Sequence, residues 1–199
     1  SAQHARALAR RFFAWAGPAP QGAFQTWSAL GARAAKAAMA ANDLVEVTVE
    51  GMGACWVLPA EREALEGASI PPDAFAFLPF SDNAIALRDV APHVDPAHHG
   101  IEIDTWGAGR ATLGQAKSLW GRAVFVGGAL AGLWEWDPER EAVVWGTFEP
   151  RPRLASALER EAEAITGFIH ALGEARTTSN DGARSQSKRA GFINAHLNR

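Results

Sequence analysis

The stretch from Gln21 to Leu58 constrains the fold more than any other part of this chain. It contains a short helix, a turn at Gly31, an Ala-rich helix over residues 32–41 and two strands. Residues 44–50 alternate apolar side chains with Glu and Thr, which is typical of a half-buried strand. A Gly-Met-Gly turn then leads into a second strand. Helix, turn, helix and hairpin in this order predict a winged helix-turn-helix.

The residues around this stretch predict a small helical core. Leu8, Phe12 and Trp15 recur at helical spacing, so one face of an N-terminal helix should be buried. Two nearby prolines end that helix, since proline cannot continue it. Ser28 is expected to cap the Ala-rich helix. Cys55, the only cysteine, excludes an internal disulfide and is expected to be a buried thiol, because it lies in an apolar strand.

Charge is distributed unevenly along the sequence. The chain carries a net charge of −3, which argues against indiscriminate nucleic-acid binding. Up to Asp43, however, the positive residues outnumber the acids, whereas residues 44–110 are rich in Asp and Glu. A cationic helical face could contact a polyanion, although two ordinary solvated surfaces would give the same pattern. The positive residues are Arg6, Arg10, Arg11, Arg33 and Lys36.

The second half of the chain predicts a sheet covered by a helix. Residues 122–136 predict a hairpin around Gly127-Gly128, and residues 141–148 predict a further strand. The paired glycines do not form a phosphate loop, because a strand and not a helix follows them. Residues 154–172 carry an apolar stripe at helical spacing. Trp120, Trp134, Trp136 and Trp145 are expected to fill the core of this sheet.

A histidine cluster lies in the segment HVDPAHHG, residues 93–100. His and Asp are zinc ligands, but such short spacing is weak evidence, and the segment better fits Asp95 as the cap of a helix that begins at Pro96. No membrane-spanning run and no signal peptide pattern is present, and a cytoplasmic protein without cofactor is expected.

These patterns predict an α+β protein. A winged helix-turn-helix over residues 1–66 is followed by a mostly antiparallel β domain with a C-terminal amphipathic helix over residues 67–176. Residues 59–72, acidic and rich in proline, are expected to connect the two domains. Residues 177–199 are polar and basic, and are predicted to be a flexible tail.

Six ordered segments of the chain resemble the winged-helix DNA-binding family that includes AlkZ-type DNA glycosylases. They are the N-terminal region through GMGACWVL, then FLPFSDNAIALRD, VDPAHH, RAVFVGGALAGLWEW, and VVWGTFEP with EREAEAITGFIHAL. The resemblance implies tandem winged helices and a β-barrel-like domain around duplex DNA. It also favours the cap over a metal site at Asp95, so no metal is expected.

Family members excise alkylated or crosslinked bases with a Gln-x-Gln motif, which this sequence lacks. The chain is therefore expected to bind double-stranded DNA without catalysis, with Arg33 and Lys36 on backbone or base edges and Arg6, Arg10 or Arg11 on phosphates. Two alternatives remain. In the first, the chain is a DNA glycosylase in which Asp82 or Asp89 activates the water. In the second, it is a module that binds a protein partner.

Overall fold

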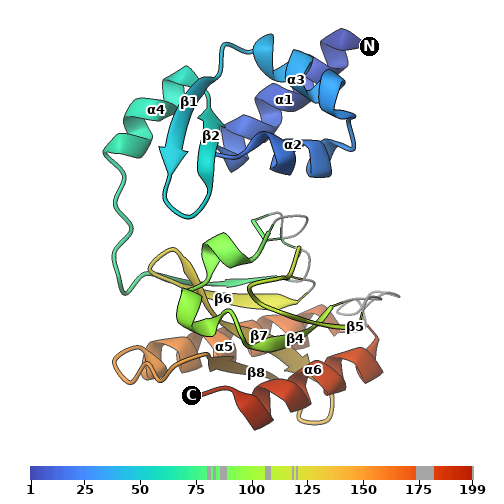
Figure 1. Cartoon of the computed structure of the whole chain (residues 1–199). Coiled ribbons are helices and arrows are strands. Elements are labelled where there is room, and N and C mark those ends of the chain that lie inside the picture. Colours follow the sequence, from blue (N-terminus) through green and yellow to red (C-terminus); the bar gives the residue numbers. More distant parts are fainter. Residues whose placement is uncertain are drawn as a thin grey trace.

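The computed structural model describes residues 1–79, 82, 84–85, 89–105, 109–117, 119, 121–173 and 182–198, with the backbone alone at residues 104, 105 and 109. The protein is a mixed α+β structure in two parts joined by residues 67–74 (Figure 1). No helix in the described part of the chain is long and apolar enough to span a bilayer.

The first part is a cluster of helices followed by a hairpin. Its apolar residues form one buried cluster, with Phe12, Phe13 and Phe24 at most 1% exposed. The strands β1 and β2 pair antiparallel, with Val47 opposite Cys55. The elements of this part are α1 (Ala2–Ala16), α2 (Gln21–Ser28), α3 (Ala32–Ala40), β1 (Val45–Val49), β2 (Gly53–Val57) and α4 (Pro59–Glu66).

Three details of the first part differ from the sequence predictions. Ser28 ends α2 instead of capping α3, because Ala29 adopts a left-handed conformation and Gly31 precedes α3. Trp15 and Leu8, both expected on the buried face, are 42% and 36% exposed, since α1 buries Ala9, Phe12 and Phe13 instead. The acidic part of the expected connector is helical. In α4, Pro59 occupies the first turn and Arg62 pairs with Glu66 one turn later.

The second part is built on a four-stranded antiparallel sheet in the order β3-β6-β7-β8, and a separate hairpin, β4-β5, lies beside it. The predicted strands β6, β7 and β8 and the amphipathic helix α5 are confirmed, whereas β3, β4 and β5 were not predicted. The elements are β3 (Phe75–Leu78), η1 (Ala91–His93), η2 (Pro96–His98), β4 (Glu102–Thr105), β5 (Gly109–Thr112), β6 (Arg122–Val126), β7 (Ala129–Asp137), β8 (Ala142–Thr147), α5 (Ala155–Leu172) and α6 (Ala183–His196).

Both faces of the sheet are buried. On one face Trp134, Trp136 and Trp145 pack in a cluster with Leu158 of α5, which confirms the core position predicted for these three tryptophans. On the other face Leu133 packs in a second cluster with Ile193 of α6. Trp120 lies outside the described residues.

The prediction of a flexible tail over residues 177–199 is wrong for its described part, because residues 183–196 form the helix α6. Ala190 and Ile193 are buried, so this helix closes one face of the sheet. After α6, Asn198 and Thr147 exchange backbone hydrogen bonds of 2.7 and 2.9 Å. The sequence prediction failed because α6 has few apolar residues, and the sheet supplies most of the partners that hold it.

Candidate nucleic-acid interface

The predicted cations lie on two helices that pack together. Ala9 of α1 and Ala35 of α3 are both fully buried in one cluster, and small side chains at such positions let two helices approach closely. The amide of Asn42 fixes the pair, because its Nδ2 donates hydrogen bonds to the backbone oxygens of Arg6 and Ala38, at 3.0 and 2.8 Å.

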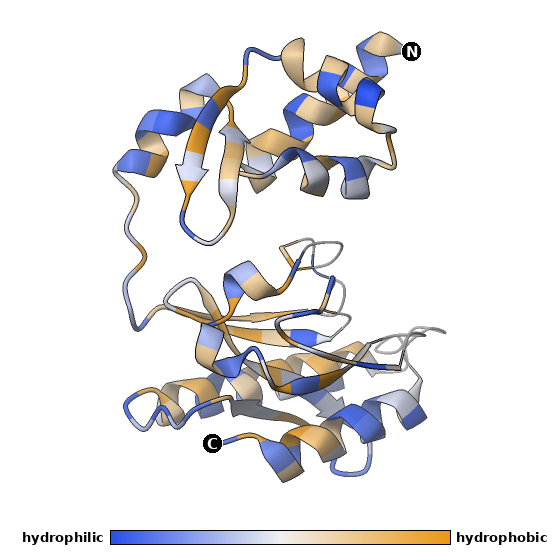
Figure 2. Ribbon diagram, viewed as in Figure 1, coloured by the Kyte–Doolittle hydropathy of each residue, from blue (hydrophilic) through white to orange (hydrophobic). Residues whose placement is uncertain are grey.

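This packing leaves the cations on the outside. Since α3 buries Ala35, Ala38 and Met39, Arg33 and Lys36 are exposed. The three arginines of α1 are exposed as well. No ion pair or hydrogen bond joins any of these five side chains to another residue in the described ranges. Figure 2 shows hydrophilic residues along α1 and α3. The guanidinium and ammonium groups are therefore available to phosphate oxygens.

The hairpin β1-β2 has the opposite charge. Glu46 and Glu50 are exposed, and the turn that follows is made of Gly51, Met52 and Gly53, with both glycines at positive φ. In the interior of the hairpin Cys55 is fully buried, as predicted, and burial raises the pKa of its thiol. This hairpin brings no cation to a phosphate.

A cleft of about 660 Å³ separates the first part of the protein from the second. On one side lie the hairpin turn and the start of α2, with Gly22 and Met52 among the lining residues. On the other side lie Asp89, His93 and Lys117. Lys117 Nζ is 3.2 Å from a carboxylate oxygen of Asp89, and both side chains remain largely exposed. An exposed pair of this kind holds its two groups only weakly, so both can exchange partners.

Of the two acids predicted as possible catalytic residues, Asp89 lines the cleft and Asp82 does not. Asp82 is bound locally, because its Oδ1 accepts a hydrogen bond of 2.8 Å from the backbone N–H of Ala84. Asp89 lines the cleft, whereas the cations of α1 and α3 do not. Asp82 thus has a structural contact, and only Asp89 faces a space that a ligand could enter.

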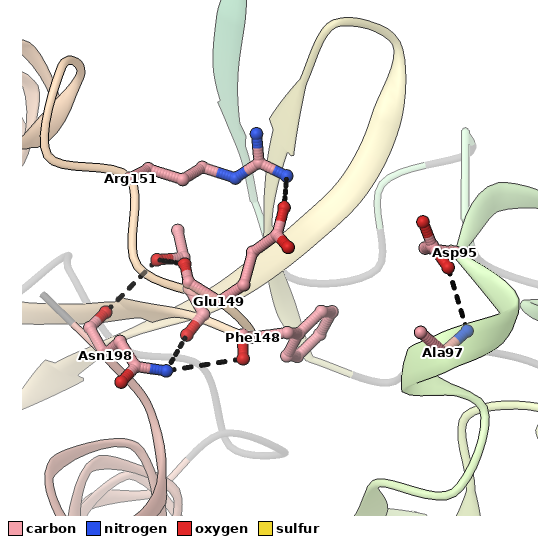
Figure 3. Close-up of polar contacts among 7 residues, drawn as sticks. Asp95, Ala97, Phe148, Glu149, Arg151 and Asn198 are labelled. Carbon is pink, nitrogen blue, oxygen red and sulfur yellow. Dashed lines mark hydrogen bonds and ion pairs between the residues drawn. The ribbon is translucent and has the colours of Figure 1, made fainter.

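Asp95 caps a short helix, as one of the two interpretations of the histidine segment predicted. Its Oδ1 accepts from the N–H of Ala97 at 2.8 Å, and Pro96 begins the 3-10 helix η2 (Figure 3). His98 lies against the ring of Phe148, and Nε2 of His99 is 3.2 Å from the backbone oxygen of Ala91. Among the described residues there is no group of three or more His, Cys, Asp or Glu side chains placed to hold a metal ion.

Sequence reasoning missed Lys117 and His93 as cleft residues. They lie far apart from Met52 in sequence, and no periodicity links them to the hairpin turn. The sequence around Lys117 gave no local signal, because residues 105–134 contain no Asp or Glu and Lys117 is one of three cations there.

Comparison with known proteins identifies the family. The sequence matches the family described as "DNA glycosylase AlkZ-like" over residues 1–168. The chain belongs to the AlkZ-like family. No curated protein matches the chain.

A solved structure has a similar fold. Streptomyces sahachiroi DNA glycosylase AlkZ superposes with a TM-score of 0.63 at 21% sequence identity, over 83% of this chain and 44% of that one. The chain thus spans less than half the length of the solved AlkZ. At this level of identity the likeness establishes the fold alone.

Proposed function

We propose that this AlkZ-like chain is a duplex DNA-binding protein. The observation that carries the proposal is the set of exposed cations on α1 and α3, which have no partner in the described part of the chain. Duplex DNA presents a dense row of phosphates, and neutralising them releases bound counterions. The family takes its description from a DNA glycosylase, and the similar solved structure carries that name too, which supports DNA as the ligand.

The order of elements supports a winged helix-turn-helix over residues 1–66. In this interpretation α3 is the recognition helix and β1-β2 is the wing. The outer surface of α3 combines Arg33 and Lys36 with the exposed, small Ala34 and Ala37. Such a surface allows close approach to a groove and places its charges beside the backbone. The acidic hairpin limits the contact to the helices.

Fluorescence anisotropy with a labelled duplex tests this function. We expect binding in low salt that weakens steeply as salt rises, because each phosphate contact contributes about 0.9 to the logarithmic salt slope. The double variant R33A/K36A should bind more weakly and show a shallower slope. R62A is the matched control, since Arg62 is an exposed cation of the same part that is already paired with Glu66. Absence of duplex binding by the intact chain in low salt would overturn the proposal.

A second candidate function is base excision by this chain. The cleft lined by Asp89 and Lys117 favours it, because an excised base has to leave the stack and enter an enclosed space. Incubation with alkylated duplex, followed by detection of abasic sites, tests for the reaction.

The variants D89N and D82N separate the two acids. Excision should disappear in D89N and persist in D82N, because the amide oxygen of an asparagine can still accept the hydrogen bond from Ala84. Excision that is equal in both variants and in the native chain would remove Asp89 from the reaction. No abasic sites with the native chain would leave binding as its activity.

A further inference from the structure

The helix α6 lies beyond residues 1–168, where the chain matches its family. It contains Arg184, Lys188, Arg189 and His196 but no Asp or Glu, so it is cationic in a protein whose net charge is −3. None of these residues is used by the DNA contacts proposed for α1 and α3. The function of this charge is therefore a separate question.

The orientation of α6 is fixed by buried contacts along one side. Glu135 of β7 is fully buried, and its carboxylate accepts from Arg189 Nε and from Arg122 Nη1, each at 2.5 Å. Gln186, Ala190 and Ile193 are buried beside these contacts. Arg189 is paired with Glu135 inside the protein. The opposite side of α6 faces outward.

Four residues form a stripe along one side of α6, and one of them, Phe192, also packs against the core cluster that contains Ile193. Arg184, Lys188, Phe192 and His196 are spaced four residues apart, which aligns side chains along one helix face. Arg184, Lys188 and His196 are exposed, and Phe192 is half-buried. The rings of Phe192 and His196 lie 5.1 Å apart. The stripe therefore has a cationic first half and an aromatic second half.

The stripe borders a groove. Lys188, Phe192 and His196 line a hollow of about 220 Å³, and Glu102 and Arg110 of the β4-β5 hairpin form its other wall. Arg110 pairs with Glu102 at 3.2 Å, with both side chains more than 60% exposed. Such a pair contributes little stability, so an incoming anion can compete with Glu102 for the Arg110 guanidinium. Gly191 also lines the hollow and leaves open space, because nothing lies within 4 Å of where its Cβ would be.

We propose that this groove binds an unpaired nucleic-acid strand. Single strands are held by cations that follow the phosphates and by rings on which bases stack, and the stripe offers these in sequence. Arg184, Lys188 and Arg110 are the phosphate contacts, and Phe192 with His196 forms the stacking surface. A duplex keeps its bases stacked inside and gains nothing from the rings, which is why the unpaired strand is favoured. The proposal is independent of duplex binding by α1 and α3.

Anisotropy titrations with a labelled single-stranded oligonucleotide test the groove. The variant R184A/K188A should weaken binding and reduce the logarithmic salt slope by about 0.7 for each phosphate that the protein no longer neutralises. The variant F192L keeps an apolar side chain but removes the ring, so it should weaken binding by roughly fivefold or more with an unchanged salt slope. Helical content and urea midpoints of both variants establish that α6 remains folded.

Two controls keep the outcomes distinct. R160A removes an exposed cation from α5 and should leave single-strand affinity unchanged. R33A/K36A should weaken duplex binding but not single-strand binding, and the α6 variants should show the reverse. Native single-strand affinity in both R184A/K188A and F192L would overturn the groove, whatever the duplex titration shows. A uniform loss with R160A as well would also overturn it, because it would indicate nonspecific charge attraction.

Discussion

The helices α5 and α6 cover opposite faces of the same sheet, but different forces hold them. α5 buries an apolar stripe, with Leu158 fully buried and Ala162 3% exposed against the tryptophans of the sheet. α6 contributes fewer apolar side chains and is tied down by Arg189 at a buried carboxylate and by the backbone bridge at Asn198.

The way in which each helix is held against the sheet determines how much of its surface is available for binding. The outward side of α5 carries Glu161 and Glu163, and Glu159 accepts a hydrogen bond from Trp145 Nε1 at 2.9 Å. α6 is anchored by specific polar contacts, and it therefore needs only a narrow apolar strip. The rest of its circumference is left for the cations and rings of the groove.

The largest expected effect tests the apolar side of this comparison. L158A removes a fully buried side chain from α5 and should lower the free energy of unfolding by about 3–4 kcal/mol, through lost transfer energy and a cavity. Urea denaturation measures it. L172A in the same helix is the control, because Leu172 is 44% exposed, and it should change stability by less than about 1 kcal/mol. Equal losses in the two variants would contradict the assignment of the buried stripe.

The next effect tests the polar anchor of α6. E135Q leaves two largely buried guanidinium groups without their anion and should lower the free energy of unfolding by about 2–3 kcal/mol near neutral pH. Arg122 and Arg189 remain charged, so the loss should appear first as opening of α6. Hydrogen exchange of the α6 amides, compared with those of α5, measures where the protein opens. Uniform loss of protection in both helices would contradict a local anchor.

The same variant has a pH signature. Burial raises the pKa of Glu135 above its ordinary value of 4.5, while Arg122 and Arg189 oppose the rise. Between the ordinary and the raised pKa the folded protein holds the proton more tightly than the unfolded chain, so the contribution of Glu135 to stability falls as pH rises through this window. The native protein should show this negative slope above pH 4.5 relative to E135Q. Parallel pH profiles in urea denaturation would show that the pKa is unshifted.

The smallest expected effect tests how the chain after α6 packs against Gly146 of β8. A Cβ added at Gly146 would lie 2.5 Å from the Cβ of Leu197, so G146A should displace the end of α6 and cost about 1–2 kcal/mol. Loss of amide protection at Thr147 and Asn198 would report the displacement. G167A in α5 is the matched control, because nothing lies within 4 Å of its added Cβ, and helix propensity predicts a gain of about 0.5–1 kcal/mol. A loss in G167A would mean that the outward side of α5 is covered.

Periodicity predicted those elements whose own residues carry the pattern. The alternation of residues 45–49 and the stripe of α5 follow from burying one face of a strand or helix, so β1 and α5 were predicted from the sequence. The cap at Asp95 was foreseen for a similar reason, since an Asp followed by Pro fits the start of a helix. In the candidate interface, the exposure of Arg33 and Lys36 also follows from their spacing among alanines.

The sequence by itself determined the α+β class, three of the four strands of the main sheet, the position of α5 and the cationic character of α1 and α3, because these depend on neighbours within one element. Only the tertiary structure decided that the basic C-terminal segment is a helix, since Arg189 needs the buried carboxylate of Glu135, 54 residues away. It likewise placed Arg110 opposite Lys188, and Asp89 opposite the hairpin turn. Such contacts join side chains from distant elements, and the hydrophobic periodicity within one element cannot predict them.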